Sequence, residues 1–488
     1  MGLSVALNTA RTSLLASSNQ LATTARNVAG ANDPGYSRKI ATLIPGSGGA
    51  TVTITRASDA ALYARTLSAS SDAARGEALL NGLTQLAQTV GDTDDPTSPA
   101  ARLTRFQAAL QAAANQPNNT AVVRDAVEAA KALAGSLQEA AETVHASRAE
   151  ADKGIADSVT RLNDLLSRFD TANKAVIRAV SNNADATDAL DDRDRILTAI
   201  SQEIGVTAVT RGNGDVALYT DGGVTLFDRG PRAVTFASTT AFAGGSKGNA
   251  VVIDGVPVTG ATSPMPLSSG RIAGLAALRD QTAVTYEAQL DTLAGGLIAA
   301  FAETDSVPPL GAAKPGLFTV GSSGALPAAN AAGRTGLASR ITINAAVDPD
   351  QQGDVSLLRD GGMNGTDYAD PAGGGDASYN GHLRGLISAL AGTLTLDPSL
   401  GLGTASDLPS LAAASAGWLE TQRKDATASA SYQKTLLSRA NEALSNVAGV
   451  NGDDETALAL QLERSYSASA KIISVIDDLL KAFLDTVR

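Results

Sequence analysis

The sequence predicts a mainly α-helical protein with an inserted β-region, organised as nested domains. At both ends of the 488-residue chain, apolar and small residues recur at alternating steps of four and three. This spacing is typical of one narrow stripe along a coiled-coil helix. Between residues 206 and 258 the pattern changes to the apolar–polar alternation of β-strands. If the two terminal stripes pair as a coiled coil, everything between them is an insertion.

The terminal stripes lie in helices that we expect over residues 3–29 and 455–487. Several stripe positions hold Ala, Ser or Thr, and a buried serine contributes almost nothing, whereas a buried leucine contributes about 2 kcal/mol. One pair of terminal helices would therefore bury too little apolar surface to be stable alone. We expect other copies of the chain to pack against the pair. The same periodicity also fits an ordinary globular protein with long terminal helices. The stripe residues expected to contact other subunits, with Tyr466 from a second apolar row, are Leu3, Leu7, Leu14, Leu21, Leu458, Leu462, Tyr466, Ile472, Ile476, Leu479 and Phe483.

The elements between the stripes follow from local signals. Pro34 and Gly35 predict a turn after the first helix, and an extended segment is expected over 40–56. Helical patterns are found at 57–90, 98–115, 119–180, 186–203, 268–303, 354–359, 381–392 and 406–447. Strand patterns bounded by glycine-rich turns are found at 206–228, 234–236, 251–253, 317–320 and 340–343.

This order of elements predicts three nested parts. Residues 1–45 and 450–488 are expected to form a terminal coiled-coil base. Residues 46–185 and 405–449 are expected to form a stalk of long helices. Residues 186–404, which contain most of the strand patterns, are expected to form an inserted β-rich outer domain at the tip.

Composition excludes several classes of function. The net charge of −12 argues against nucleic acid and anionic lipid as partners. The absence of cysteine excludes disulfides and thiolate metal sites. No apolar run is long enough to span a membrane, and the N-terminus lacks the pattern of a cleaved signal peptide. We therefore expect a protein that is cytoplasmic or exported without a cleaved peptide.

No catalytic, cofactor-binding or metal site is expected, and the sequence indicates a protein that is not an enzyme. The two histidines, His145 and His382, lie far apart, and His145 is expected on a solvated helix face. No nucleophile-elbow, P-loop or dinucleotide motif is found. The acidic loop at 348–380 lacks the spacing of an EF-hand. The charge run Asp191–Arg195 is expected to be a solvated helix face or a salt-bridge patch between subunits.

Two terminal motifs resemble those of the bacterial flagellar axial proteins. The run NVAGANDPGYSR at 27–38 is similar to the signature that ends their first helix, although Gly30-Ala31 replaces its second Asn. The runs VAGVNGDDE at 447–455 and SYSASAKII at 465–473 are similar to their C-terminal motifs, with Gly452 in place of the usual Leu or Pro.

Two central segments narrow the resemblance to the hook-associated protein 1 family. ALDDRDRIL at 189–197, followed by Ile-Gly-Val at 204–206, is similar to one segment of that family. SGRIAGL at 269–275, followed by Leu-Arg-Asp at 278–280, is similar to another. The alternatives are a flagellin, another hook-associated protein, or a secreted adhesin or enzyme on a flagellar scaffold. An enzyme would need a dense cluster of catalytic or metal-ligating residues, which the sequence lacks.

The resemblance implies a structural subunit at the junction between hook and filament that polymerises through its terminal helices. Its implied partners are further copies of itself, the hook protein, a second junction protein and an export chaperone on the C-terminal helix. Its implied location is the extracellular flagellum, reached without a cleaved signal peptide. The resemblance also makes Asn27, Gly35, Tyr36 and Arg38 candidate subunit contacts; ordinary packing of the turn against the first helix is the alternative.

Overall fold

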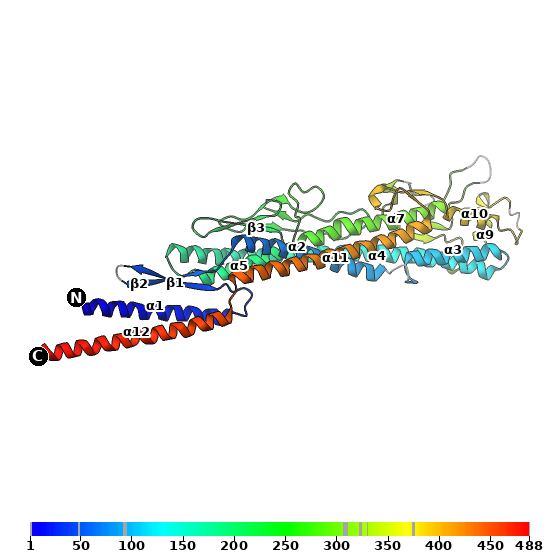
Figure 1. The fold of residues 1–488 in the computed structure, drawn as a ribbon. Helices are drawn as coiled ribbons and strands as arrows, with labels where there is room; N and C mark the ends of the chain where they lie inside the picture. Colours follow the sequence, from blue (N-terminus) through cyan, green and yellow to red (C-terminus); the bar gives the residue numbers. More distant parts are fainter. Residues whose placement is uncertain are drawn as a thin grey trace.

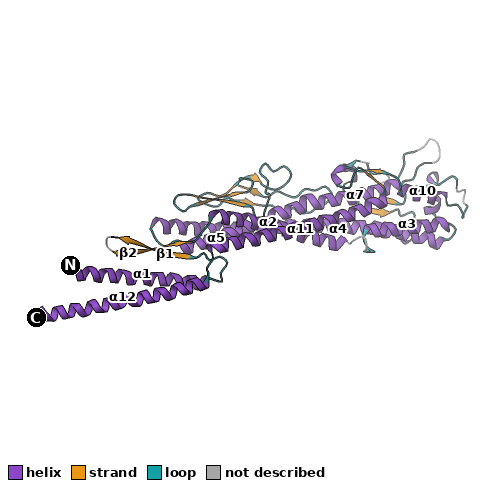
Figure 2. Cartoon of the chain, in the orientation of Figure 1, coloured by secondary structure: helices purple, strands orange, loops and turns teal. Residues whose placement is uncertain are grey.

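The computed structural model describes residues 2–46, 49–90, 95–305, 311–321, 325–328, 330–372 and 376–487. Over these residues the chain forms an elongated rod of long helices, and both ends of the chain lie at the same end of the rod (Figure 1). Strands lie in small sheets beside the helices (Figure 2). The predicted fold class, mainly α-helical with an inserted β-region, is confirmed.

The helices agree closely with the sequence patterns. Their bounds are α1 Gly2–Gly30, α2 Ala60–Val90, α3 Pro99–Asn115, α4 Thr120–Ser181, α5 Thr187–Glu203, α6 Arg271–Ala277, α7 Ala283–Ala300, α8 Ala331–Arg334, α9 Leu357–Asp360, α10 Gly381–Leu390, α11 Leu408–Ala448 and α12 Gly452–Val487. One predicted helix differs from its expected form, and α8 was not predicted. The segment expected over 268–303 begins at Arg271, because Gly270 has a φ of +90°, and a π-helical turn at Leu278–Thr282 separates α6 from α7.

The strands form five small antiparallel sheets within the described residues. Their bounds are β1 Lys39–Gly46, β2 Gly49–Arg56, β3 Val206–Thr210, β4 Val216–Thr220, β5 Thr225–Phe227, β6 Val234–Thr235, β7 Val252–Ile253, β8 Val256–Pro257, β9 Phe318–Val320, β10 Ile341–Ile343, β11 Leu394–Thr395 and β12 Ala405–Ser406. The sheets are β1–β2, β3–β4–β5, β6–β7–β8, β9–β10 and β11–β12. They are distributed along the rod and at its base rather than gathered in one place (Figure 2).

Side-chain caps fix the starts of three rod helices. Ser98, Asn119 and Asp407 precede α3, α4 and α11, and each accepts a hydrogen bond from a backbone N–H in the first turn, at 3.3, 3.2 and 2.7 Å. Such caps satisfy N–H groups that have no partner inside the helix. The helix starts read from the sequence therefore have a local physical cause.

Two hydrophobic cores follow one another along the rod. The first joins α3, the N-terminal part of α4 up to Ala151, α7, α10 and the start of α11. Phe106, Phe301 and Phe318 pack at its centre, with ring centroids 5.2–5.6 Å apart. The second core joins the remainder of α4, from Ile155 onward, to α5, α6 and the sheets β3–β5 and β6–β8. Helix α4 therefore belongs to both cores.

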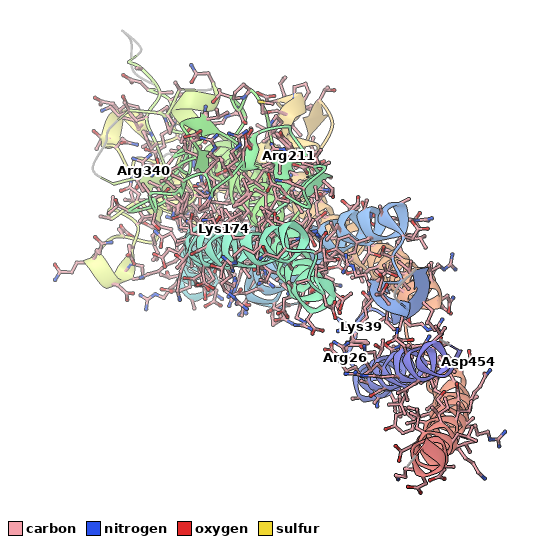
Figure 3. All side chains as sticks on the ribbon, turned by 90° about the vertical axis from the view of Figure 1, so that its left-hand side faces the viewer. Arg26, Lys39, Lys174, Arg211, Arg340 and Asp454 are labelled. Carbon is pink, nitrogen blue, oxygen red and sulfur yellow. The ribbon has the colours of Figure 1, made fainter. Side chains whose placement is uncertain are left out.

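The two terminal helices form a separate part, the base, beside one end of the rod. Helices α1 and α12 lie side by side, and the hairpin β1–β2 packs on α1. Viewed from that end, the base with Asp454 stands off to one side of the rod that carries Lys174, Arg211 and Arg340 (Figure 3). Arg26 and Lys39 lie where the base meets the rod.

Candidate functional site

Helix α12 presents two apolar rows that differ in burial. The row toward α1 contains Ile476, which is 6% exposed, and Ser469, whose hydroxyl lies 3.3 Å from that of Ser13 on α1. A further row, distinct from the one that contains Tyr466, lies about a quarter of a helical turn away. Its side chains are 37% to 53% exposed, and it consists of Leu458, Ile472, Val475 and Leu479.

The structure thus divides the stripe predicted on α12 between the two rows. Leu462 and Ile476 lie toward α1, whereas Leu458, Ile472 and Leu479 are exposed, and Tyr466 is 39% exposed. The four-three spacing placed these residues in one stripe, because sequence periodicity alone does not show which of them the partner helix covers. Contact of these residues with another subunit stays a prediction.

The stripe predicted on α1 lies closer to its partner helix. Leu7, Leu14 and Leu21 are partly buried, and the small residues between them, Ala10, Ser17 and Thr24, are fully buried. The side chains of Leu3 and Phe483 lie outside the described part of the structure.

Asn27 is the centre of a buried hydrogen-bonded cluster at the end of α1. Its side chain is 1% exposed. Its Nδ2 donates to the Lys39 carbonyl oxygen at 2.9 Å and to Glu455 Oε2 at 3.0 Å. Its Oδ1 accepts from the Lys39 N–H and from the Tyr36 hydroxyl, both at 2.9 Å. One amide therefore joins α1, the following turn, the first strand and α12.

Glu455 on α12 completes this cluster. Its side chain is only 1% exposed, and its Oε1 accepts from Arg38 Nε at 2.7 Å. The Arg38 N–H also donates to the Ala448 carbonyl oxygen at 2.7 Å, at the end of α11. We call Asn27, Tyr36, Arg38, Lys39 and Glu455 the anchor. Three of the four motif residues singled out from the sequence meet here, within one subunit.

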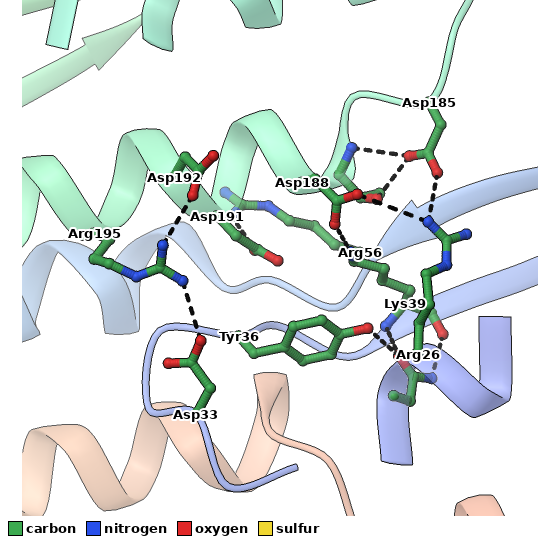
Figure 4. A network of polar contacts seen from close by, with 12 residues as sticks. Arg26, Asp33, Tyr36, Lys39, Arg56, Asp185, Asp188, Asp191, Asp192 and Arg195 are labelled. Atoms are coloured by element: carbon green, nitrogen blue, oxygen red, sulfur yellow. Dashed lines mark hydrogen bonds and ion pairs between the residues drawn. The ribbon is translucent and has the colours of Figure 1, made fainter. Parts of the chain in front are cut away.

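Charged pairs connect the anchor to the rod (Figure 4). The Lys39 ammonium, 1% exposed, pairs with Asp188 on α5 and lies 4.7 Å from the centre of the Tyr36 ring. Arg26 pairs with Asp185 and Asp188 at 3.5 and 3.8 Å. A buried ammonium needs such partners, because a lone charge is costly to remove from water.

The start of α5 provides further contacts. Arg56, at the end of β2, pairs with Asp191 at 3.2 Å and with Asp194 at 2.5 Å. Arg195 pairs with Asp33 in the turn after α1, at 3.2 Å (Figure 4). The prediction for the run Asp191–Arg195 was wrong in part: Asp191 and Arg193 are buried and pair within the chain, whereas Asp192 and Arg195 are exposed. Sequence distance hides these partners, since Arg56 and Asp191 are 135 residues apart.

Two glycines allow the turn to pack tightly. A Cβ on Gly30 would lie 2.6 Å from the Tyr36 ring, and a Cβ on Gly35 would lie 2.7 Å from Arg195 Nε. Real Cβ atoms essentially never come this close, although the half-exposed Arg195 side chain could move away from a Cβ on Gly35. Gly30, which departs from the family signature, therefore provides the surface on which Tyr36 rests.

Burial shifts the ionisation of the groups at this site. It raises the pKa of Tyr36 to about 12 and lowers the pKa of Lys39 below its usual value. It also raises the pKa of Asp191, against the opposing effect of Arg56. For Asp185, burial acts to raise the pKa, but hydrogen bonds from Thr187 and the nearby Arg26 lower it overall. At neutral pH Tyr36 is therefore a firm hydrogen-bond donor to Asn27.

Sequence reasoning missed Lys39, Arg56, Asp188 and Glu455 as members of this site. Glu455 lies inside the C-terminal motif, and Lys39 directly follows the N-terminal one. Their positions in or beside the motifs were the signal that could have identified them. The prediction for His145 was also wrong. Its side chain is 20% exposed, and its Nε2 lies 2.6 Å from Glu287 Oε1. Within the described residues, no group of three or more potential ligands is arranged to hold a metal ion.

Comparison with known families gives the site its context. Residues 83–306 match the family described as Flagellar hook-associated protein FlgK helical domain. Residues 443–486 match Flagellar basal body rod FlgEFG protein C-terminal. Together the two matches cover more than half of the chain. The chain belongs to the FlgK family, flagellar hook-associated protein 1. This is a family of structural flagellar proteins and not an enzyme family, and the resemblance seen in the terminal and central motifs is confirmed.

A solved structure with partial similarity is that of the flagellar hook junction protein FlgK from Burkholderia pseudomallei. It shares 25% sequence identity with this chain, with a TM-score of 0.42. The alignment covers 53% of this chain and 47% of that one. The chain therefore spans about half the length of that structure. No curated protein matches. None of the helices described is long and apolar enough to cross a membrane.

Proposed function

We propose that the chain is a structural subunit of the junction between flagellar hook and filament, and that it polymerises through its terminal helices. The observation that carries this proposal is the exposed row Leu458, Ile472, Val475 and Leu479 on α12. The neighbouring row already packs toward α1, so the exposed row is free to receive another subunit.

The free energy gained by covering this exposed row fits a contact that is repeated in a polymer. A fully buried Leu or Ile side chain contributes about 2 kcal/mol, so covering four side chains that are roughly half exposed contributes about 4 kcal/mol. Association costs at least that much in lost translational and rotational freedom. One such contact is therefore weak. In a polymer each subunit has several neighbours, and the free energies of these contacts add. The small residues in the terminal stripes also make several neighbours necessary, because one helix pair buries little apolar surface.

The partners proposed for these surfaces are further copies of the chain, the hook protein and a second junction protein. An export chaperone on α12 is proposed for the free subunit, and an extracellular flagellar location for the assembled one. Membership of the FlgK family supports these proposals. We retain the division of a base, 1–45 with 450–488, from the remainder. The stalk predicted over 46–185 and 405–449 shares both hydrophobic cores with the outer domain predicted over 186–404, so we propose that these two parts act as one rod.

The test is a pair of matched substitutions on α12. Leu479→Asp places a charge in the exposed row, where burial against another subunit would cost several kcal/mol. Leu460→Asp is the control, because Leu460 is 55% exposed on another side of the same helix. Each variant is expressed in a strain that lacks its own copy, and motility and shed flagellin are measured.

We expect Leu479→Asp to abolish motility and release flagellin into the medium, while hooks persist. Leu460→Asp should remain motile, and both purified proteins should have the helical content of the wild type. Normal motility of the Leu479→Asp strain would contradict the proposed role of this row. Loss of motility without hooks would place the protein elsewhere in the flagellum.

A further inference from the structure

A layer of buried charges crosses the rod where its two hydrophobic cores meet. On α4, Ala151 is the last residue of the first core and Ile155 the first of the second. Between and beside them lie Asp152 and Arg148, which are 3% and 0% exposed. Arg279 and Glu287, 0% and 3% exposed, face them from the π-helical turn and α7. We call these four residues the charged layer.

The charged layer is a connected set of pairs. Arg148 Nη1 lies 3.2 Å from Glu287 Oε2, and Arg279 Nη1 lies 2.6 Å from Asp152 Oδ1. Arg148 Nε also donates to the Arg279 carbonyl oxygen at 3.1 Å, which joins the two pairs. Since every charge has a partner, the layer is stable while closed. Removal of one partner would leave a buried charge alone, which is strongly destabilising.

The π-helical turn makes the connection between the pairs possible. In this turn the Ala283 N–H bonds to the Leu278 carbonyl oxygen, one residue further back than in an α-helix. The Arg279 carbonyl oxygen, which an α-helix would pair with the Ala283 N–H, accepts from Arg148 instead. The wide turn is therefore tied directly to the charged layer.

The layer also holds a loop, residues 236–249, which we call the strap. Arg148 donates to the Ser246 carbonyl oxygen, and Arg279 Nη2 donates to that of Asn249 at 2.8 Å. The Thr239 N–H donates to Asp152 Oδ2 at 2.9 Å. The strap thus reaches the rod through the same charges that separate the two cores.

We propose that the charged layer is a joint at which the two cores of the rod open as separate units. If two cores part at an apolar boundary, they expose apolar surface at about 25 cal/mol per Å². At this boundary, apart from Leu275, which packs against both cores, they expose arginines and carboxylates, which regain the hydration that burial removed. Opening therefore costs least at the layer, and the strap opens with the second core. This inference does not depend on the proposed junction role.

Native-state hydrogen exchange of the full chain, with two matched core truncations, tests the joint. Leu133 and Leu166 are both fully buried on α4, one in each core. We expect Leu133→Ala to accelerate exchange by at least roughly 30-fold in α3 and α10, and Leu166→Ala to do so in α5 and β3–β5, each leaving the other core unchanged. Equal acceleration of both cores by both substitutions would show one cooperative unit and would overturn the proposal.

Two changes to the layer separate its role from that of the cores. Asp152→Asn should accelerate exchange in the strap and the π-helical turn and leave α3 and α10 at the wild-type rate. Replacing all four charges together, Arg148→Met, Asp152→Leu, Arg279→Met and Glu287→Leu, with Asp280→Asn because Asp280 pairs with Arg279, should make both cores exchange as one unit. Separate opening in a folded protein with this apolar layer would overturn the role of the charges. If that variant fails to fold, the two core truncations still decide whether the joint exists.

Discussion

Replacing Asn27 by alanine removes the group that joins all parts of the anchor. The side chain makes four hydrogen bonds of 2.9–3.0 Å while only 1% exposed. Each buried partner left unsatisfied costs about 1 kcal/mol. Water can reach the half-buried Tyr36 hydroxyl, so at least three partners lose their hydrogen bond. We therefore expect Asn27→Ala to destabilise the anchor by about 3 kcal/mol.

The loss should be local, because the hydrophobic cores lie elsewhere in the rod. Hydrogen exchange of residues 31–57 and 448–460 is the direct measurement, and about 3 kcal/mol corresponds to roughly 100-fold faster exchange where opening is limiting. Exchange in α4 should be unchanged. Asn8→Ala is the matched control, since Asn8 is an exposed asparagine on the same helix. An effect of Asn27→Ala no larger than that of Asn8→Ala would refute the account of the anchor.

Three further predictions concern glycine packing and pH. Gly30→Ala should destabilise the base by about 1–3 kcal/mol, because its Cβ would meet the Tyr36 ring at 2.6 Å. Gly135→Ala should instead stabilise the protein by about 0.5–1 kcal/mol in thermal unfolding, since nothing lies within 4 Å of its Cβ on α4. Burial raises the pKa of Asp291 from 3.8 to about 6, so its protonated form is favoured in the folded state. Its contribution to stability is full below pH 4 and is lost as the pH rises through 6. Urea unfolding at pH 4 and pH 7 should therefore show a fall of up to roughly 3 kcal/mol for the wild type relative to Asp291→Asn.

The long elements were predictable from the sequence because their causes are local. Periodicity and caps such as Asn119 place the helices to within a few residues. The alternation after residue 206 and the turns at Asn213-Gly214 and Asp221–Gly223 place the meander of β3, β4 and β5. In each case the deciding residues lie within one element, so the chain does not need to be folded for the pattern to be seen.

The polar sites were not predictable, because their partners are distant in the sequence. Arg148 and Glu287 are 139 residues apart, and Asn27 and Glu455 are 428 apart. Nothing local distinguishes Arg148 from a solvated arginine on a long helix. His145 was assigned to solvent for the same reason. The π-helical turn was missed as well, because Arg148, which donates to its Arg279 carbonyl oxygen, lies 131 residues away in the sequence.

The contacts between base and rod differ in kind from those inside the rod. Asp33 and Arg195 are about half exposed, and an exposed pair of this type contributes about 0–1 kcal/mol. The ion pairs of Lys39 and Arg56 favour one placement of the base on the rod. In a displaced base, Asp191 and Lys39 would be buried without partners. Apolar packing would favour any orientation that buries the same area, whereas these pairs favour one. These pairs therefore fix where the exposed row of α12 points, and a subunit contact through that row inherits its direction from them.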